Sequence, residues 1–361
     1  MGGSDVLVTR KESPTYLGLM PTPRFRDLDP QQSLEVIDAF LGADSKVSFT
    51  EKLAGQNLVA IVTPTGDVLT TSKSAGRIAS GMFPEVTGPL EKFHPPVETN
   101  TKYTFEIIRS TKRPDFIDYK IDTPYVAVEF SGAMTKDVAQ QLNNGQKDVK
   151  FYTSDDIKKS VKGVLGPEQK TYLQFIRDKI AGGAKLTPQE KSETEDVLMS
   201  ALDSGAFPSS IGGQRIEGLF GTTASGGFKI PSKKYAEIQR MQAGLYGAVK
   251  NAGKKEFSLR FQEEKAGDRL VADVLKYLEK VAGTQQTPGF RFFFSPAEAK
   301  ELLSGDIKEL GKKFYDRVKS KDWVSSQQVD PQVKLENKNT YNTRRLLREF
   351  IRGLLAFPQV R

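Results

Sequence analysis

One lysine lies where a strand pattern is interrupted by a turn, and its position could support nucleophilic chemistry. The residues up to Thr50 are typical of a strand, Gly55 indicates a turn, and residues 58–62 resume an apolar strand. Lys52 lies at this junction. Partial removal from water, or neighbouring cations, lower the pKa of a lysine, so that its amine becomes a nucleophile near neutral pH. Gly55 would let a ligand or a second backbone approach closely.

Two glutamates and a second lysine lie in later apolar segments. Glu106 is embedded in the strand pattern of residues 103–109, and Glu217 begins another at residues 217–220. A carboxylate in a strand either faces solvent or points into a cleft, where it can bind a hydroxyl group or a metal ion. Lys229 lies in a short strand pattern that ends at Pro231. Lys52, Glu106, Glu217 and Lys229 are therefore the candidates for a charged site if the fold brings them together.

These segments resemble, in their order, the motifs of the covalent nucleotidyltransferase superfamily, which includes polynucleotide ligases and mRNA-capping enzymes. Lys52 and Gly55 fit its Lys-x-x-Gly motif, and residues 215–220 (Arg-Ile-Glu-Gly-Leu-Phe) resemble its Glu-Gly motif. A glutamate strand, a Pro-containing turn, Ile-Asp-Tyr and an apolar strand follow one another as in phage RNA-ligase-type proteins. The resemblance covers about residues 45–240. It implies an α+β fold with an antiparallel-sheet nucleotidyltransferase core, similar to the ATP-grasp-like ligase core.

The resemblance also implies a reaction and a set of residues. Lys52 would attack ATP to form lysyl-AMP, and AMP would pass to a nucleic-acid end, with Glu217 and Lys229 as further catalytic residues. Mg²⁺ or Mn²⁺ would be bound by Glu106 and Glu217. We expect these two glutamates on neighbouring strands, facing one pocket with Lys52 and Lys229. The nucleotide-binding residues implied are Glu51, Gly55, Asn57, Lys73, Glu106, Phe130, Gly218 and Lys233.

The sequence departs from the family pattern at two positions. Ala54 stands where the family usually has an aspartate, and Pro231 stands where it has a second lysine. We therefore expect slow or absent adenylylation. Two alternatives stay open: a catalytically inactive ligase-like protein that binds nucleic acid or has a structural role in a phage, and an unrelated α+β interaction protein. RNA is favoured over DNA as the partner, because the pattern of the chain after the Lys229–Pro231 segment is mainly helical, whereas DNA ligases and capping enzymes commonly have a barrel there.

The amino-acid composition excludes several kinds of catalytic and metal site. The chain has 361 residues, a net charge of +8, no cysteine and one histidine. Disulfides, thiolate nucleophiles and multi-histidine zinc sites are therefore excluded, and any metal would be a hard cation with oxygen ligands. The positive charge is consistent with a polyanionic partner such as nucleic acid or a nucleotide. No apolar run reaches the roughly 18–20 residues of a membrane span. The absence of cysteine suits a reducing compartment, so we expect a cytoplasmic protein, in the host cytoplasm if it comes from a phage.

Local patterns predict three regions: an N-terminal segment (1–45), the core (46–255) with a helical insertion at about 135–205, and a mainly helical C-terminal region (256–361). A hairpin turn is predicted at residues 65–67. Thr187 and Ser295, each followed by proline, predict helix starts. Strands are expected after the turn at residues 113–115 and at 289–294. Helices are expected at residues 31–41, from about 153, and at 172–180, 235–249, 259–281 and 342–356.

Overall fold

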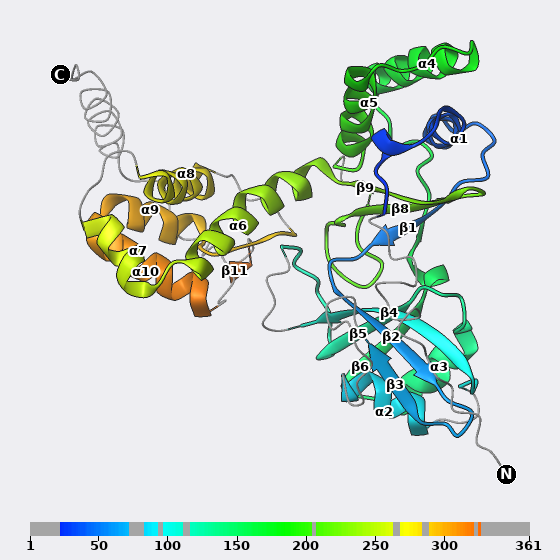
Figure 1. Ribbon diagram of the computed structural model, residues 1–361, viewed down its shortest axis with the longest axis horizontal. Helices are drawn as coiled ribbons and strands as arrows, with labels where there is room; N and C mark the ends of the chain where they lie inside the picture. Colours follow the sequence, from blue (N-terminus) through cyan, green and yellow to red (C-terminus); the bar gives the residue numbers. More distant parts are fainter. Residues whose placement is uncertain are drawn as a thin grey trace. The chain divides into compact units, whose positions relative to one another are not determined.

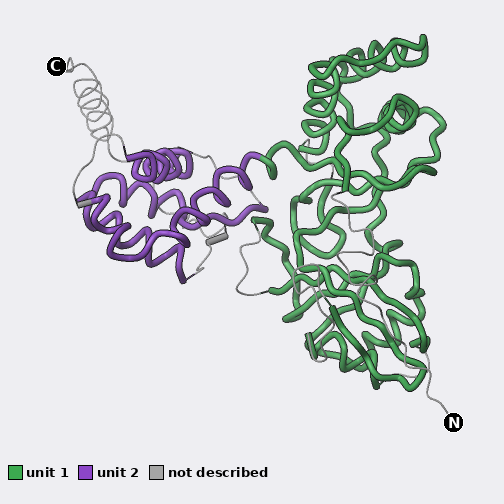
Figure 2. The backbone as a smooth tube through the Cα atoms, viewed as in Figure 1, with its two compact units in different colours: residues 1–236 green, residues 237–361 purple. Residues whose placement is uncertain are grey.

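The structure is a computed structural model that describes residues 22–71, 83–92, 97–110, 116–203, 207–262, 268–283, 289–320 and 324–325. The chain forms two compact units, residues 1–236 and residues 237–361, which Figure 2 colours separately. Helices and sheets are both present, so the expected α+β class is confirmed (Figure 1). Lys73 and the helix expected at residues 342–356 lie outside the described residues.

The first unit contains a four-stranded sheet in the order β7-β1-β8-β9, in which every neighbouring pair is antiparallel. Three of its side chains, Phe49, Leu219 and Phe228, belong to a buried apolar cluster that also includes residues of three helices. One face of this sheet is therefore core. The strands are β1 (Ser48–Lys52), β7 (Lys158–Lys159), β8 (Gly218–Thr223) and β9 (Gly226–Pro231), and the helices are α1 (Pro30–Leu41), α4 (Pro167–Ala181) and α5 (Pro188–Ala201).

A second, five-stranded sheet in the same unit has the order β3-β2-β4-β5-β6. Its neighbouring strands are antiparallel except for the parallel pair β5–β6. Leu58 and Phe105 lie in a separate buried cluster with Val86 of α2 and Leu142 of α3, so this sheet also has one core face. The elements are β2 (Gln56–Val62), β3 (Val68–Thr71), β4 (Thr101–Arg109), β5 (Tyr125–Glu129), β6 (Val149–Thr153), α2 (Pro84–Lys92) and α3 (Lys136–Asn144).

Several elements follow directly from local sequence signals. The helix expected at residues 31–41 is α1, where the Asp29 side chain accepts a hydrogen bond from the Gln32 N–H at 2.8 Å. The expected hairpin joins β2 to β3. Thr187 caps α5, and Ser295 caps α9 (Pro296–Ser304), each with proline at the first helical position as predicted.

Other expectations are corrected. The block at residues 135–205 is not only helical, because it also supplies β6 and β7, one strand to each sheet. The start expected near residue 153 is a single 3-10 turn, Ser154–Ile157. The helix expected at residues 259–281 is two helices, α7 (Lys254–Gln262) and α8 (Arg269–Gly283). The expected strand at 289–294 is reduced to β10 (Arg291–Phe292), and none of the named strands lies at residues 116–124.

The second unit is built mainly of helices around an aromatic core. Phe257, Phe293 and Phe314 are fully buried, and their rings contact one another or neighbouring aromatic rings. The buried Tyr277 hydroxyl donates to Gln242 Oε1 at 3.1 Å and accepts from the Phe293 N–H at 2.9 Å, and burial raises its pKa. No described helix is both long and apolar enough to cross a membrane. The remaining elements are α6 (Lys233–Asn251), α10 (Ile307–Ser320) and β11 (Val324–Ser325).

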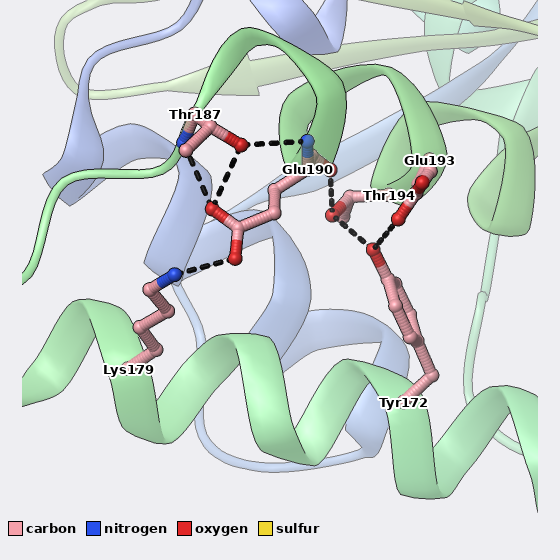
Figure 3. A network of polar contacts seen from close by, with 6 residues as sticks. All are labelled: Tyr172, Lys179, Thr187, Glu190, Glu193 and Thr194. Atoms are coloured by element: carbon pink, nitrogen blue, oxygen red, sulfur yellow. Dashed lines mark hydrogen bonds and ion pairs between the residues drawn. The ribbon is translucent and has the colours of Figure 1, made fainter.

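Helices α4 and α5 form a hairpin held by the polar network in Figure 3. Lys179 of α4 forms an ion pair with Glu190 of α5. The Glu190 carboxylate also accepts hydrogen bonds from the Thr187 N–H at 2.9 Å and the Thr187 hydroxyl at 3.0 Å. Lys179 and then Thr187 favour the charged carboxylate, which lowers the pKa of Glu190 to about 2.

This network predicts an acid-sensitive part of the stability. Because the folded-state pKa of Glu190 is lowered from 4.5 to about 2, its contribution is present above the ordinary pKa and is lost as pH falls toward 2. Glu190→Gln should therefore lower the free energy of unfolding at pH 7, and the difference from the native chain should shrink below about pH 5. Urea unfolding followed by circular dichroism measures this. Glu168→Gln, at an exposed first-turn glutamate of α4, is the control. A difference that stays constant with pH would contradict the assignment.

Candidate functional site

Lys52 is the last residue of β1 and lies opposite Gly218 of β8. The next strand, β2, begins at Gln56 and belongs to the other sheet, so residues 53–55 connect the two sheets. Gly218 is required by packing, because a Cβ atom there would lie 2.3 Å from the Ile230 carbonyl oxygen. The close approach at this glycine is thus between β8 and β9. The sequence therefore placed Lys52 correctly at a strand end but did not reveal the change of sheet.

Three charged side chains come together at the end of β1: Lys52, Glu217 and Lys229. The Lys52 Nζ atom donates to Glu217 Oε1 in an ion pair, in which the Glu217 side chain is 8% exposed and that of Lys52 is 29% exposed. Burial raises the pKa of Glu217, while Lys52, Lys229 and the Tyr235 hydroxyl act in the opposite direction. The site therefore holds one buried carboxyl group between two lysines. Tyr235, near the start of α6, carries no recognisable motif, and sequence reasoning missed it.

Strand alternation explains why the two lysines share a face. Lys229 lies opposite Phe220, which lies opposite Thr50 of β1. Directly opposed residues point to the same side of a sheet, and so do residues two apart along a strand. Lys52 and Lys229 therefore project from the face that is turned away from the apolar cluster of this sheet.

A second group of candidate residues lies on the five-stranded sheet beside Gly55. A Cβ atom at Gly55 would lie 2.7 Å from the Ile107 carbonyl oxygen and 2.8 Å from Glu106 Cγ. Asn57 is directly opposite Glu106 in the pairing of β2 with β4. The Phe130 N–H donates to the Thr104 carbonyl oxygen at 2.8 Å, which extends the β4–β5 register by one residue. Asn57, Glu106 and Phe130 therefore share the face turned away from the Leu58 cluster.

Two buried polar atoms on this face lack hydrogen-bond partners among the described residues: Asn57 Oδ1 and Thr71 Oγ1. Thr71 is 2% exposed and lies opposite Val59, two residues beyond Asn57 on β2. Alternation thus puts both atoms on the same face. A buried acceptor without a partner costs about 1–3 kcal/mol, so each of these atoms needs a partner, such as water or a bound group. Sequence reasoning included Asn57 but did not name Thr71, although it did name Lys73, two residues further along the chain.

Glu51 lies on the opposite side of β1 from Lys52. It is fully buried, and its carboxylate accepts from the Ser209 hydroxyl at 2.6 Å and the Ser210 N–H at 2.7 Å. Lys159 Nζ lies 3.5 Å from the same carboxylate. Burial raises the pKa of Glu51, although these partners act against the rise. Glu51 therefore belongs to a polar cluster separate from the Lys52–Glu217 pair.

The expected arrangement of the two site glutamates needs one correction. Glu106 and Glu217 are not on neighbouring strands, because β4 pairs with β2 and β5, whereas Glu217 directly precedes β8 in the other sheet. Lys233, the first residue of α6, is exposed. The described residues contain no group of three or more His, Asp or Glu side chains placed to hold a metal ion. A cation here would need further oxygen ligands, such as phosphates and water.

No family model and no curated protein matches this sequence. The function is therefore inferred from the geometry of Lys52 and its surroundings together with the order of the motifs.

Gly55 offers a test of the close contact between the turn and β4. Gly55→Ala should lower the free energy of unfolding by about 1–3 kcal/mol, because the new Cβ would overlap the Ile107 carbonyl oxygen and Glu106 Cγ. Gly88→Ala in α2 is the matched control, since a Cβ atom there meets nothing within 4 Å; its effect should be neutral or stabilising. Denaturant unfolding of both variants measures the difference. Equal stabilities would show that the turn does not press against β4.

Proposed function

We propose that the chain is an RNA-ligase-like nucleotidyltransferase, in which Lys52 accepts AMP from ATP and passes it to a nucleic-acid end. The observation that carries the proposal is the Lys52–Glu217 ion pair with Lys229 beside it. Two lysines on one sheet face, one of them ion-paired with a buried carboxyl group, form a suitable set for attack at a phosphate. The order of the sequence motifs supports the same chemistry.

The reaction has two transfers. In the first, Lys52 Nζ attacks the α-phosphorus of ATP, a P–N bond forms, and the P–O bond to pyrophosphate breaks. Nζ must lose a proton to do so, and the hydrogen-bonded Glu217 carboxylate is its nearest acceptor. In the second, a terminal phosphate oxygen of the nucleic acid attacks the same phosphorus, and the P–N bond breaks. Lys229 supplies positive charge where negative charge develops on the phosphate oxygens.

The residues present fit a nucleotide, and a hard divalent cation would need phosphate and water oxygens besides their carboxylates. The buried Asn57 Oδ1 and Thr71 Oγ1 atoms can accept hydrogen bonds from the base or ribose, and Phe130 on the same face can stack on a base. Glu217 and Glu106 offer carboxylate oxygens of the kind that Mg²⁺ and Mn²⁺ bind. When bound, such a cation would neutralise charge on the phosphates.

A second candidate function is favoured by Ala54, which lies two residues after Lys52 in the Lys-x-x-Gly motif. Ala54 is 9% exposed and has no polar side chain, and its N–H donates to the Tyr119 hydroxyl at 2.9 Å. An acid that would assist catalysis is therefore missing. A catalytically inactive ligase-like protein, which binds nucleic acid or serves as a phage structural protein, would keep the scaffold and lose the chemistry.

The lysine is tested by intact-mass measurement after incubation with ATP and Mg²⁺. The native chain should gain the mass of one AMP, and Lys52→Arg should gain none. Arginine keeps the positive charge beside Glu217 but stays protonated near neutral pH, so it removes the nucleophile without leaving the carboxyl unpaired. Lys162→Arg, at an exposed lysine of the same unit, is the control and should still form the adduct. Reversible ATP binding without an adduct would favour the inactive alternative. An adduct that persists in Lys52→Arg would refute the role of Lys52.

Ala54 is tested by restoring the acid. Ala54→Asp should raise the single-turnover rate of lysyl-AMP formation at saturating ATP by at least about tenfold. A charge-assisted hydrogen bond made in the transition state is worth roughly 1.5–3 kcal/mol. Ala54→Asn, which has the same size without the charge, separates the effect of charge from that of volume. An unchanged or lower rate in Ala54→Asp, with ATP still bound, would show that Ala54 is not a missing catalytic acid.

A further inference from the structure

The backbone is held on both sides of Lys52 by side chains from distant parts of the chain. On the preceding side, the buried Glu51 carboxylate accepts from the Ser209 hydroxyl at 2.6 Å and the Ser210 N–H at 2.7 Å. On the following side, the Ala54 N–H donates to the Tyr119 hydroxyl at 2.9 Å. Both attachments lie within three residues of the lysine.

The two segments that provide these attachments are packed backbone to backbone. A Cβ atom at Gly212 would lie 2.4 Å from the Lys120 carbonyl oxygen, and one at Gly213 would lie 3.1 Å from that of Asp118. Both glycines have positive φ angles, 111° and 122°, which side chains rarely adopt. The segment 209–213 therefore lies directly against the segment 118–120. Glu51 and Ala54 are therefore hydrogen-bonded to two segments that pack against each other.

We propose that Tyr119 is a positioning residue for Lys52, acting with Glu51 and Ser209 as a clamp on the backbone that carries the nucleophile. The proposal deepens the proposed function and rests on it, since it assigns to Tyr119 the orientation of the attacking amine. Tyr119 acts through the Ala54 N–H, so its effect is on geometry rather than on charge at the phosphate. Small misplacements of a reacting group cost large factors in rate, about a hundredfold per ångström.

Ala54 takes part in the clamp through its backbone. The side chain at this position offers no hydrogen bond, but the backbone N–H is used by Tyr119. The buried N–H would otherwise be unsatisfied, which costs about 1–3 kcal/mol. The turn between β1 and β2 is thus fixed by a hydroxyl group that lies 65 residues away in sequence.

The test removes the hydroxyl group in Tyr119→Phe and measures two properties of Lys52. In single-turnover adenylylation, the rate constant at saturating ATP should fall at least tenfold, while the ATP concentration at half-maximal rate changes by less than twofold. Ser209→Ala should act in the same direction. Tyr172→Phe, which removes a hydroxyl group in the α4–α5 hairpin, is the matched control and should leave the rate unchanged. A rate unaffected by Tyr119→Phe would overturn the proposal.

A second readout separates this proposal from the proposed function. Lys52 is modified with acetic anhydride in each variant, and its acetylation rate is measured by peptide mass spectrometry. Loosening of the turn should free the amine from Glu217 and raise this rate at least threefold in Tyr119→Phe, but not in Tyr172→Phe. If the native chain never forms an AMP adduct, the proposed function fails and acetylation alone decides whether the clamp exists. Equal acetylation in all variants would overturn the clamp whether or not the chain is an enzyme.

Discussion

Each sheet of the first unit packs one apolar face against its own helices. The four-stranded sheet turns Phe49, Leu219 and Phe228 into the core, and the five-stranded sheet does the same with Leu58 and Phe105. Side chains alternate along a strand, so the residues between them must project from the other face. Lys52 and Lys229 of the smaller sheet and Asn57 and Glu106 of the larger one come from these other faces, whereas the buried Glu51 lies on the core side of β1. The apolar cluster on one face of the smaller sheet therefore leaves the other face to Lys52 and Lys229.

The Lys52–Glu217 pair is the most constrained interaction of that site. A buried carboxylate is expensive to keep charged, and its ion pair offsets that cost only while both partners remain. Removal of Lys52 alone would break the ion pair of Glu217. Among the described residues, Lys229 would then be the lysine that still acts on this carboxyl group. A lysine in this position has a structural role besides any chemical one, which is why a substitution that preserves the charge is more informative than truncation to alanine.

Sequence reasoning succeeded where the information is local. Thr187 and Ser295 cap helices as predicted, because a short polar side chain can reach the N–H groups of the next turn, and this depends on only a few adjacent residues. The strand that ends at Lys52 and the hairpin after β2 are local in the same sense.

Long-range pairings could not be predicted in this way. The hydrogen bond from Ala54 to Tyr119 and those from Ser209 and Ser210 to Glu51 join segments that have no shared periodicity. For the same reason, the sequence did not reveal that consecutive strands enter different sheets, or that Glu106 and Glu217 come from separate sheets.

The segment between β5 and β8 cannot be removed without damage to both sheets of the first unit. Because β6 pairs with β5 and β7 pairs with β1, the segment supplies an edge strand to each sheet, while α4 and α5 cover the apolar face of the smaller one. Excision of the segment would leave two strand edges unpaired and would expose Phe49 and Leu219 to water. Unpaired edges and exposed apolar faces promote aggregation. The segment is therefore part of the scaffold and not a removable module.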